Sequence, residues 1–319
     1  YRDSASWCPY CEKVWLMLEE KRIPYKINFV PMSCYGRKPQ EFLQIQPSGG
    51  IPVAIIKGKV ISESNDILSA IESLYPDQHP MVPAPGTDKY KSFQPFLRTE
   101  RKIFGAWFQW LVTGFGEKEF INAADETNEA LSKYKDGDYF LGSFSMVDCM
   151  YAPFLERMAA SVPYYKGLIF RGNPRWSYIN KWFDAMESRP SFKGIQSDYY
   201  THCHDLPPQI GGAQFSGDHK RYTDEIDGHG DSWKLPLSQE GGLEPVRAED
   251  RDQAKARRGA ARALIDRHEA VAKFSTRPWG ERGPGVSAPL ADTYNKPQPK
   301  AEDSVDIALR LTAEFLLGS

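Results

Sequence analysis

Residues 6–15 read SWCPYCEKVW and decide the fold of a chain of 319 residues. Pro9 suits the first position of a helix, and the apolar residues after it recur at three- and four-residue spacing. A helix is therefore predicted from Pro9 to just before Ile23. Cys8 and Cys11 stand three positions apart at its start, which places both sulfur atoms on one turn, close enough for a disulfide to form and open.

The two cysteines are expected to play different roles. Cys8 precedes the helix, where free backbone N–H groups and the positive end of the helix dipole stabilise a thiolate, so Cys8 is the predicted nucleophile. Cys11 lies one turn further along and is expected to be less exposed. It could resolve a mixed disulfide formed on Cys8. Trp7 and Tyr10 would line the thiolate with aromatic surface.

A metal site is the alternative use of such a cysteine pair. A structural zinc ion requires four closed ligands, and Cys34, Cys149 and Cys203 are isolated in the sequence. No metal is expected at Cys8 and Cys11 for this reason. Residues 202–205, His-Cys-His-Asp, also carry ligand-type side chains. They are expected to be part of an extended segment and to make hydrogen bonds where the chain leaves a helical domain, rather than to converge on one ion.

The composition excludes several classes of protein. The chain carries 40 Lys and Arg against 42 Asp and Glu, a formal net charge of −2, and so has no global field to attract nucleic acid or an anionic membrane. No apolar run approaches the roughly 18 residues of a membrane-spanning helix. Five unevenly spaced cysteines do not resemble the disulfide framework of a small secreted domain, so a reducing intracellular compartment is expected.

The pattern along the chain predicts three parts. Residues 1–79 alternate short apolar strands with amphipathic helices, which indicates a mixed α/β domain. Few residues precede Cys8, so we expect the sequence to begin part-way through the first strand, with any targeting peptide outside it. The other parts are an all-helical domain at 87–205 and an extension at 206–319, made of an extended linker at 206–243 and helices near 245–274 and 302–317.

Local patterns predict the elements of each part. In the first domain we expect a strand at 25–30, a short helix at 39–46, a hairpin of 51–56 with 60–62 around Lys57-Gly58-Lys59, and a helix at 65–75. In the second we expect helices at 89–114, 117–135, 145–162 and 176–187. Ser145 and Asp148 form a capping box, with Asp in place of Glu, that starts the third of these. The predicted apolar sides of the extension helices carry Leu264, Ile265, Val271 and Phe274, and Val305, Ala308, Leu311 and Phe315.

The chain resembles the glutathione transferase superfamily over roughly residues 1–205. The resemblance is carried by Cys8-Pro9-Tyr10-Cys11, Ile51-Pro52-Val53, Glu63-Ser64 and Ser145 to Asp148. The cysteine motif is similar to that of glutaredoxins and of the cysteine-dependent omega and dehydroascorbate reductase classes. It also resembles plant and algal plastid members with a long C-terminal extension. The resemblance implies an α/β thioredoxin-like N-terminal domain, an all-α transferase-type C-terminal domain, and glutathione as co-substrate.

Each family role can be placed on a residue of this chain. Pro52 would be a cis proline that turns the Val53 backbone toward the cysteinyl part of glutathione. Glu63 and Ser64 would meet the ammonium and carboxylate of the γ-glutamyl end, and Lys38 the glycyl carboxylate. The implied glutathione contacts are Tyr10, Lys38, Pro52, Val53, Glu63 and Ser64. The structural alternatives are that Pro52 only shapes a turn, that Glu63-Ser64 only caps a helix, and that Lys38 is solvated surface.

A cysteine in the nucleophile position favours reduction over conjugation. Many family members use a Tyr or Ser hydroxyl to activate glutathione, whereas a cysteine forms a mixed disulfide with it. The resemblance therefore implies a glutathione-dependent thiol transferase or reductase acting through Cys8 on a small disulfide or electrophilic substrate. The alternatives are a conjugating transferase and a structural subunit docked through residues 206–319 to a protein partner, for example a plastid membrane assembly. The family is commonly dimeric, which allows a homodimer unless the extension covers that face, and the resemblance suggests the chloroplast.

Overall fold

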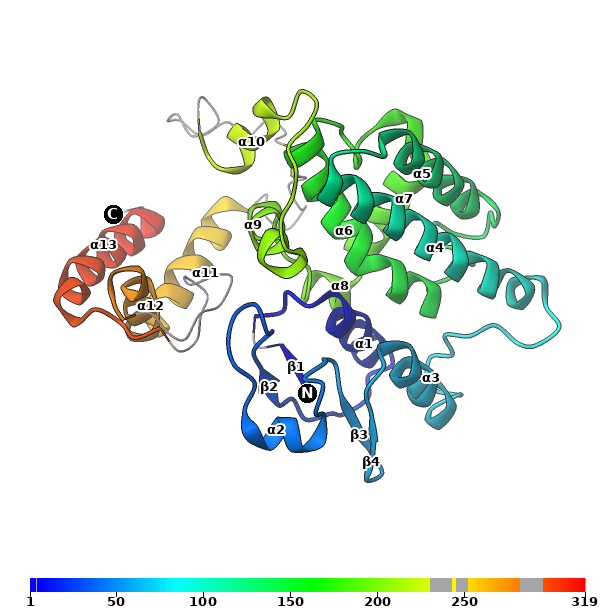
Figure 1. The fold of residues 1–319 in the computed structure, drawn as a ribbon, viewed down its shortest axis with the longest axis horizontal. Coiled ribbons are helices and arrows are strands. Elements are labelled where there is room, and N and C mark those ends of the chain that lie inside the picture. Colours follow the sequence, from blue (N-terminus) through cyan, green and yellow to red (C-terminus); the bar gives the residue numbers. More distant parts are fainter. Residues whose placement is uncertain (4, 230–242, 245–251, 282–294, 319) are drawn as a thin grey trace. The chain divides into compact units, whose positions relative to one another are not determined.

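The computed structural model describes all residues except 4, 230–242, 245–251, 282–294 and 319 (Figure 1). Its contacts divide the chain into two units. The first comprises Tyr1–Val30 and Lys38–Glu244, and the second comprises Pro31–Arg37 and Pro245–Ser319. The predicted α/β and helical domains therefore belong to one unit, which also includes the predicted extension as far as Glu244. The helices after Pro245 belong to the other unit, together with one short loop of the α/β domain.

The α/β domain is built from short strands and longer helices. Its elements are β1 (Arg2–Asp3), α1 (Pro9–Glu20), β2 (Phe29–Val30), α2 (Gln40–Ile45), β3 (Ala54–Ile56), β4 (Lys59–Ile61) and α3 (Ser64–Leu74). β1 pairs in parallel with β2, and β3 pairs antiparallel with β4. Lys57 and Gly58 join β3 to β4 with φ angles of 49° and 77°. Two positive φ angles are what a two-residue hairpin turn requires, so the predicted hairpin is confirmed.

The strand predicted at 25–30 forms only at its last two residues. Phe29 and Val30 pair with Arg2 and Asp3, and the Asn28 carbonyl accepts one further hydrogen bond from the Arg2 N–H at 3.1 Å. Residues 25–28 instead line an apolar cavity of about 470 Å³, together with residues 54–56 of β3 and Trp15 of α1.

The helical domain is centred on α6. Its elements are α4 (Asp88–Thr113), α5 (Glu117–Ser132), α6 (Met146–Lys166), η1 (Pro174–Trp176), α7 (Ser177–Glu187), α8 (Pro190–Lys193), α9 (Tyr199–Ile210) and α10 (Lys220–Ile226). Every residue of α6 is buried, because α1, α4, α9 and α10 all contact it (Figure 1). The four helices predicted here are confirmed with ends shifted by a few residues.

The capping box at the start of α6 is also confirmed. One oxygen of the Asp148 carboxylate accepts hydrogen bonds from the backbone N–H and the hydroxyl of Ser145, both at 2.9 Å. The other accepts from the indole N–H of Trp182, also at 2.9 Å, so the same side chain ties α7 to the start of α6. Asp148 is fully buried, and burial raises its pKa to about 6.

The extended linker predicted at 206–243 is wrong over its first half. α9 continues to Ile210 through Pro207 and Pro208, and α10 follows at Lys220–Ile226. Residues 202–205 are therefore helical rather than extended. Successive residues of a helix point about 100° apart, so alternate side chains do not share one side. Residues 230–242 lie outside the described part of the chain.

The second unit holds the end of the extension. Its elements are α11 (Gln253–Asp266), α12 (His268–Ser275), η4 (Arg277–Trp279) and α13 (Pro299–Leu317). Both α11 and α12 contact α13. The helix predicted near 245–274 is thus split, and its first residues lie outside the described part. The buried residues between the helices are small, Ala261, Ala272 and Ala313. Ile265, Phe274, Leu311 and Phe315, predicted on the apolar sides of these helices, are each at least half exposed.

The basic residues of α11 are exposed, as expected for a solvated helix face. Across the described residues, none of the helices combines the length and the apolar character needed to cross a bilayer.

Candidate active site

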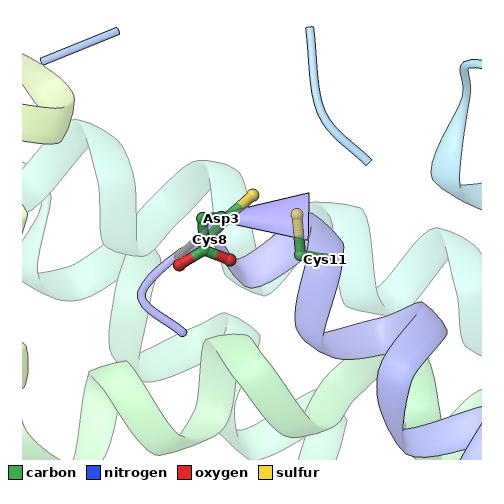
Figure 2. Close-up of side chains that lie close together, drawn as sticks. All are labelled: Asp3, Cys8 and Cys11. Atoms are coloured by element: carbon green, nitrogen blue, oxygen red, sulfur yellow. The ribbon is translucent and has the colours of Figure 1, made fainter. Parts of the chain in front are cut away.

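The site is built at the first turn of α1. Cys8 is the N-cap residue and Pro9 occupies the first helical position, as the sequence predicted. The Cys8 and Cys11 side chains are 4% and 2% exposed, so the nucleophile candidate is nearly as buried as its neighbour. Figure 2 shows both sulfur atoms beside Asp3, which comes from β1. One donor atom from each of the three residues lies within 4.8 Å of the other two.

The environment separates the pKa values of the two thiols. The hydrogen bond from Cys11 lowers the pKa of Cys8 and outweighs the opposing effect of burial, with backbone N–H groups of Tyr10 and Cys11 adding to it. Burial, followed by the hydrogen bond to Cys8, raises the pKa of Cys11 well above its usual value. Cys8 is therefore the thiol that ionises first, which agrees with its predicted role.

Asp3 is a site residue that the sequence analysis missed. It is 1% exposed, and its Oδ2 accepts a hydrogen bond from the Trp7 backbone N–H at 2.5 Å. Burial raises the pKa of this carboxyl. The sequence pattern that could have identified Asp3 is an acidic residue in a strand just before a helix that begins with a cysteine. With three donors, the Asp3 cluster is short of the four ligands of a closed structural zinc site.

The loop before β3 faces the cysteine pair. The Ile51–Pro52 peptide bond is cis, as the resemblance implied for Pro52. Val53, however, does not offer its backbone to a ligand: its N–H donates to the Tyr1 carbonyl at 3.1 Å, and its carbonyl accepts from the Tyr1 nitrogen at 2.7 Å. The prediction for Val53 is wrong because these two bonds pair its backbone with that of Tyr1, joining the residue before β3 to the residue before β1. The carbonyl nearest the site is that of Ile51, 3.9 Å from Cys8 Sγ.

The remaining predicted glutathione contacts lie at two helix starts. Glu63 is the exposed N-cap residue of α3, and Ser64 is its buried first residue. Lys38 comes two positions before α2, and its ammonium lies 5.8 Å from the centre of the Phe42 ring. This places a carboxylate and a hydroxyl at the N-terminus of α3, where free N–H groups favour an anion.

Aromatic side chains line the other side of the cysteine helix. Tyr10, 39% exposed, packs edge-on against Phe154 of α6 with ring centres 5.8 Å apart. Phe104 of α4 lies 4.7 Å from Phe154, and Arg101 lies over both of these rings. Among the other aromatic residues of the helical domain, Phe108 is exposed, and Trp107, Trp110, Trp176 and Trp182 are buried in the core.

The segment 202–205 makes hydrogen bonds instead of a convergent cluster. His202 is buried and its Nε2 lies 2.6 Å from Glu156 Oε1, whereas His204 is exposed and bonds Asp227 at 2.8 Å. The two imidazoles thus have different partners. This agrees with the predicted hydrogen-bonding role, although the helical geometry differs from the extended one assumed.

Beneath the cysteine helix lies a buried charge cluster. Arg157 of α6 donates to Glu12 of α1 at 2.8 Å and to the Trp7 carbonyl at 2.9 Å, and all three groups are largely shielded from water. Burial raises the pKa of Glu12 to about 8, with Glu156 adding to the effect, and burial raises that of Asp205 to about 8 against the Arg157 charge. The carboxyl groups of Glu12, Glu156 and Asp205 surround one guanidinium. Ionising all three would bury more negative charge than the guanidinium can balance, so the cluster retains protons at neutral pH.

Asp205→Asn is expected to change how stability depends on pH. Folded Asp205 holds a proton that an unfolded Asp with a pKa near 3.9 has released, so its contribution to stability falls as pH rises from about 4 to about 8. His202 acts in the opposite sense but only up to about pH 6.5, because burial lowers its pKa to about 3. Between pH 6.5 and 8 the variant should gain about 1–2 kcal/mol relative to wild type.

The measurement is the free energy of unfolding by urea for both proteins at pH 6.5, 7.25 and 8. The other titrating groups are common to both, so the difference isolates Asp205. Parallel pH profiles would contradict a protonated Asp205.

The comparisons with known proteins agree with this geometry. The family models for "Glutathione S-transferase, N-terminal domain" and "Glutathione S-transferase, C-terminal domain" match residues 7–74 and 115–185. The Arabidopsis thaliana protein named glutathione S-transferase DHAR2 is 30% identical over 205 residues, 61% of this chain and 86% of the relative. Several curated relatives carry the word chloroplastic in their names.

Solved structures show the same fold. Glutathione transferase Omega 3C from Trametes versicolor is 26% identical with a TM-score of 0.52, covering 65% of this chain and 90% of that one. Dehydroascorbate reductase from Chlamydomonas reinhardtii is 18% identical with a TM-score of 0.52, covering 64% and 90%, a likeness in fold. These relatives are enzymes of a family whose co-substrate is glutathione. The identity to the Arabidopsis protein, over most of that protein's length, shows that the chain belongs to the glutathione S-transferase family.

Proposed function

We propose that this protein is a glutathione-dependent thiol transferase or reductase that works through a mixed disulfide between Cys8 and glutathione. The observation that carries the proposal is the position of Cys8 as the N-cap residue of α1, with a second thiol, Cys11, one turn away, whose hydrogen bond lowers the pKa of Cys8. A thiolate is the species that attacks a disulfide, and a neighbouring thiol can resolve the product.

Atoms and electrons balance in the proposed cycle with glutathione and no further cofactor. The Cys8 thiolate attacks the glutathione sulfur of a mixed disulfide, forms the Cys8–glutathione bond and releases the substrate thiolate, which takes a proton from water. A second glutathione thiolate then attacks the adduct, giving oxidised glutathione and free Cys8. Alternatively Cys11 attacks Cys8 Sγ, releases glutathione and leaves a Cys8–Cys11 disulfide that glutathione later reduces.

The residues proposed to bind glutathione surround the cysteine pair, and each is assigned to one part of the tripeptide. Ile51, before cis Pro52, replaces Val53 as the backbone partner of the cysteinyl part, because its carbonyl lies beside Cys8 Sγ. Glu63 and Ser64 would hold the γ-glutamyl end, and Lys38 the glycyl carboxylate. Tyr10 with the aromatic rings of α4 and α6 would hold a second substrate of small size, a disulfide or an electrophile.

The test is intact mass after the reduced protein is incubated with oxidised glutathione. Cys11→Ser should retain one glutathione, because nothing resolves the adduct on Cys8. Cys8→Ser should retain none, and the wild type should pass on to an internal disulfide. Cys34→Ser is the matched control: it removes a cysteine of the other unit and should behave as the wild type.

Two other outcomes would redirect the work. If glutathione raises the melting temperature but no variant forms an adduct, the site binds glutathione for conjugation to electrophiles. If glutathione neither binds nor reacts, the redox proposal is wrong and the docking function remains.

The docking function is the second candidate. α13 exposes Ile307, Leu311 and Phe315 at four-residue spacing, each about 60% exposed. Such an apolar line on a helix favours contact with another protein or a second copy of this chain. A chloroplast location belongs to the same proposal, since several curated relatives are chloroplastic by name.

A further inference from the structure

We propose that Asp3 is the proton acceptor for Cys11 when Cys11 releases glutathione from Cys8. The inference rests on the proposed function and deepens it, because it assigns a role within the same site to a residue of β1. Its basis is geometric: the carboxylate, Cys8 Sγ and Cys11 Sγ all lie within 4.8 Å of one another in a region closed to water (Figure 2).

The carboxylate has one oxygen available for this role. Oδ2 accepts from the Trp7 N–H at 2.5 Å, which fixes the orientation of the carboxylate. Oδ1 is buried and has no hydrogen-bond partner among the described residues. A buried, unsatisfied carboxylate oxygen is costly, so its presence in a side chain whose carboxylate lies within 4.8 Å of both sulfur atoms calls for a function.

Cys11 needs such an acceptor because bulk water does not reach it. It is 2% exposed, and burial holds its pKa well above the usual value. The charged and titratable groups that act on Asp3 and the two cysteines include Arg2 of β1, Lys13 of α1, Arg157 of α6 and Asp205 of α9. Burial also raises the pKa of Asp3. The carboxylate is therefore a stronger base, and the difference between its pKa and that of the Cys11 thiol is smaller.

The step is balanced in protons and electrons. The Cys11 S–H bond breaks and the proton passes to Asp3 Oδ1, forming a carboxylic acid. The Cys11 thiolate then attacks Cys8 Sγ, so the Cys8–glutathione bond breaks as the Cys8–Cys11 bond forms, and glutathione leaves as a thiolate. Asp3 loses its proton to solvent or to the departing glutathione when the site opens.

A purely electrostatic role for Asp3 predicts the opposite result. The negative charge of Asp3 raises the pKa of both cysteines, so its removal alone makes Cys11 more acidic and its attack faster. A proton acceptor, when removed, makes the attack slower. The sign of the rate change therefore separates the two roles.

The experiment follows two rates after reduced protein is mixed with oxidised glutathione, using acid quench and intact mass. In the Cys11→Ser background, Asp3→Asn should form the Cys8 adduct at least as fast as the parent, which also shows that the site is folded. With Cys11 present, Asp3→Asn should convert the adduct to the internal disulfide about 10²-fold more slowly at pH 7. Asp3→Glu keeps a carboxylate and should retain most of the wild-type rate.

The pH profile and a control complete the test. The wild-type conversion rate should level off above the pKa of Asp3, whereas that of Asp3→Asn should keep rising toward the pKa of Cys11. Asp66→Asn removes an exposed acid of α3 and should change neither rate. An unchanged or faster conversion in Asp3→Asn would overturn the inference. Absence of any adduct in Cys11→Ser would instead refute the proposed function.

Discussion

Cys8→Ser is expected to lower turnover of a glutathionylated peptide at least about 10³-fold, as loss of a covalent nucleophile does in other enzymes. A serine hydroxyl is not ionised near neutral pH and cannot form a disulfide, so the route through the mixed disulfide closes. Cys11→Ser should keep most of the turnover, because a second glutathione can still release the adduct. The assay follows oxidised glutathione through glutathione reductase and NADPH.

The comparison of the two variants distinguishes the two release routes. If Cys11→Ser also loses turnover, release depends on the internal disulfide and not on free glutathione. Cys34→Ser should match the wild type in the same assay. Equal turnover of Cys8→Ser and wild type would show that the thiolate at the start of α1 does not carry the reaction.

Features that depend on neighbours in the sequence could be predicted. The helix at Pro9 follows from a proline at the first position and apolar spacing. The turn at Lys57-Gly58 follows from a glycine between two apolar runs, and the capping box from Ser145 and Asp148. Each is settled within a few residues, so no knowledge of the rest of the chain was needed.

Features that depend on distant partners could not be predicted. The strand predicted at 25–30 forms only at Phe29 and Val30, which pair with β1, and Val53 failed as a ligand contact because Tyr1 uses its backbone. Pro207 and Pro208 suggested a break, yet they fall in the last turn of α9, which Gly211 ends in the left-handed region. The site residue Asp3 gains its meaning only when β1 meets α1.

Arg157 bonds residues that lie far from it in the sequence. Its substitution is predicted to have the largest effect on stability. Arg157→Leu should lower the free energy of unfolding by about 3–5 kcal/mol, the usual effect of removing one partner from a buried ion pair. The side chain bonds Glu12, the Trp7 carbonyl and the Pro153 carbonyl, and leucine satisfies none of them. Urea unfolding at pH 7 measures the change.

Two comparisons make this result specific. Arg175→Leu breaks a well-aligned but exposed pair with Asp125 and should cost no more than about 1 kcal/mol. The double variant Arg157→Leu with Glu12→Leu should recover part of the loss, because the Glu12 carboxyl is then no longer buried without the guanidinium that it bonds. A loss for Arg157→Leu as small as that for Arg175→Leu would mean that the cluster is hydrated. In that case, the charge cluster would contribute little to holding α1 and its cysteines against α6.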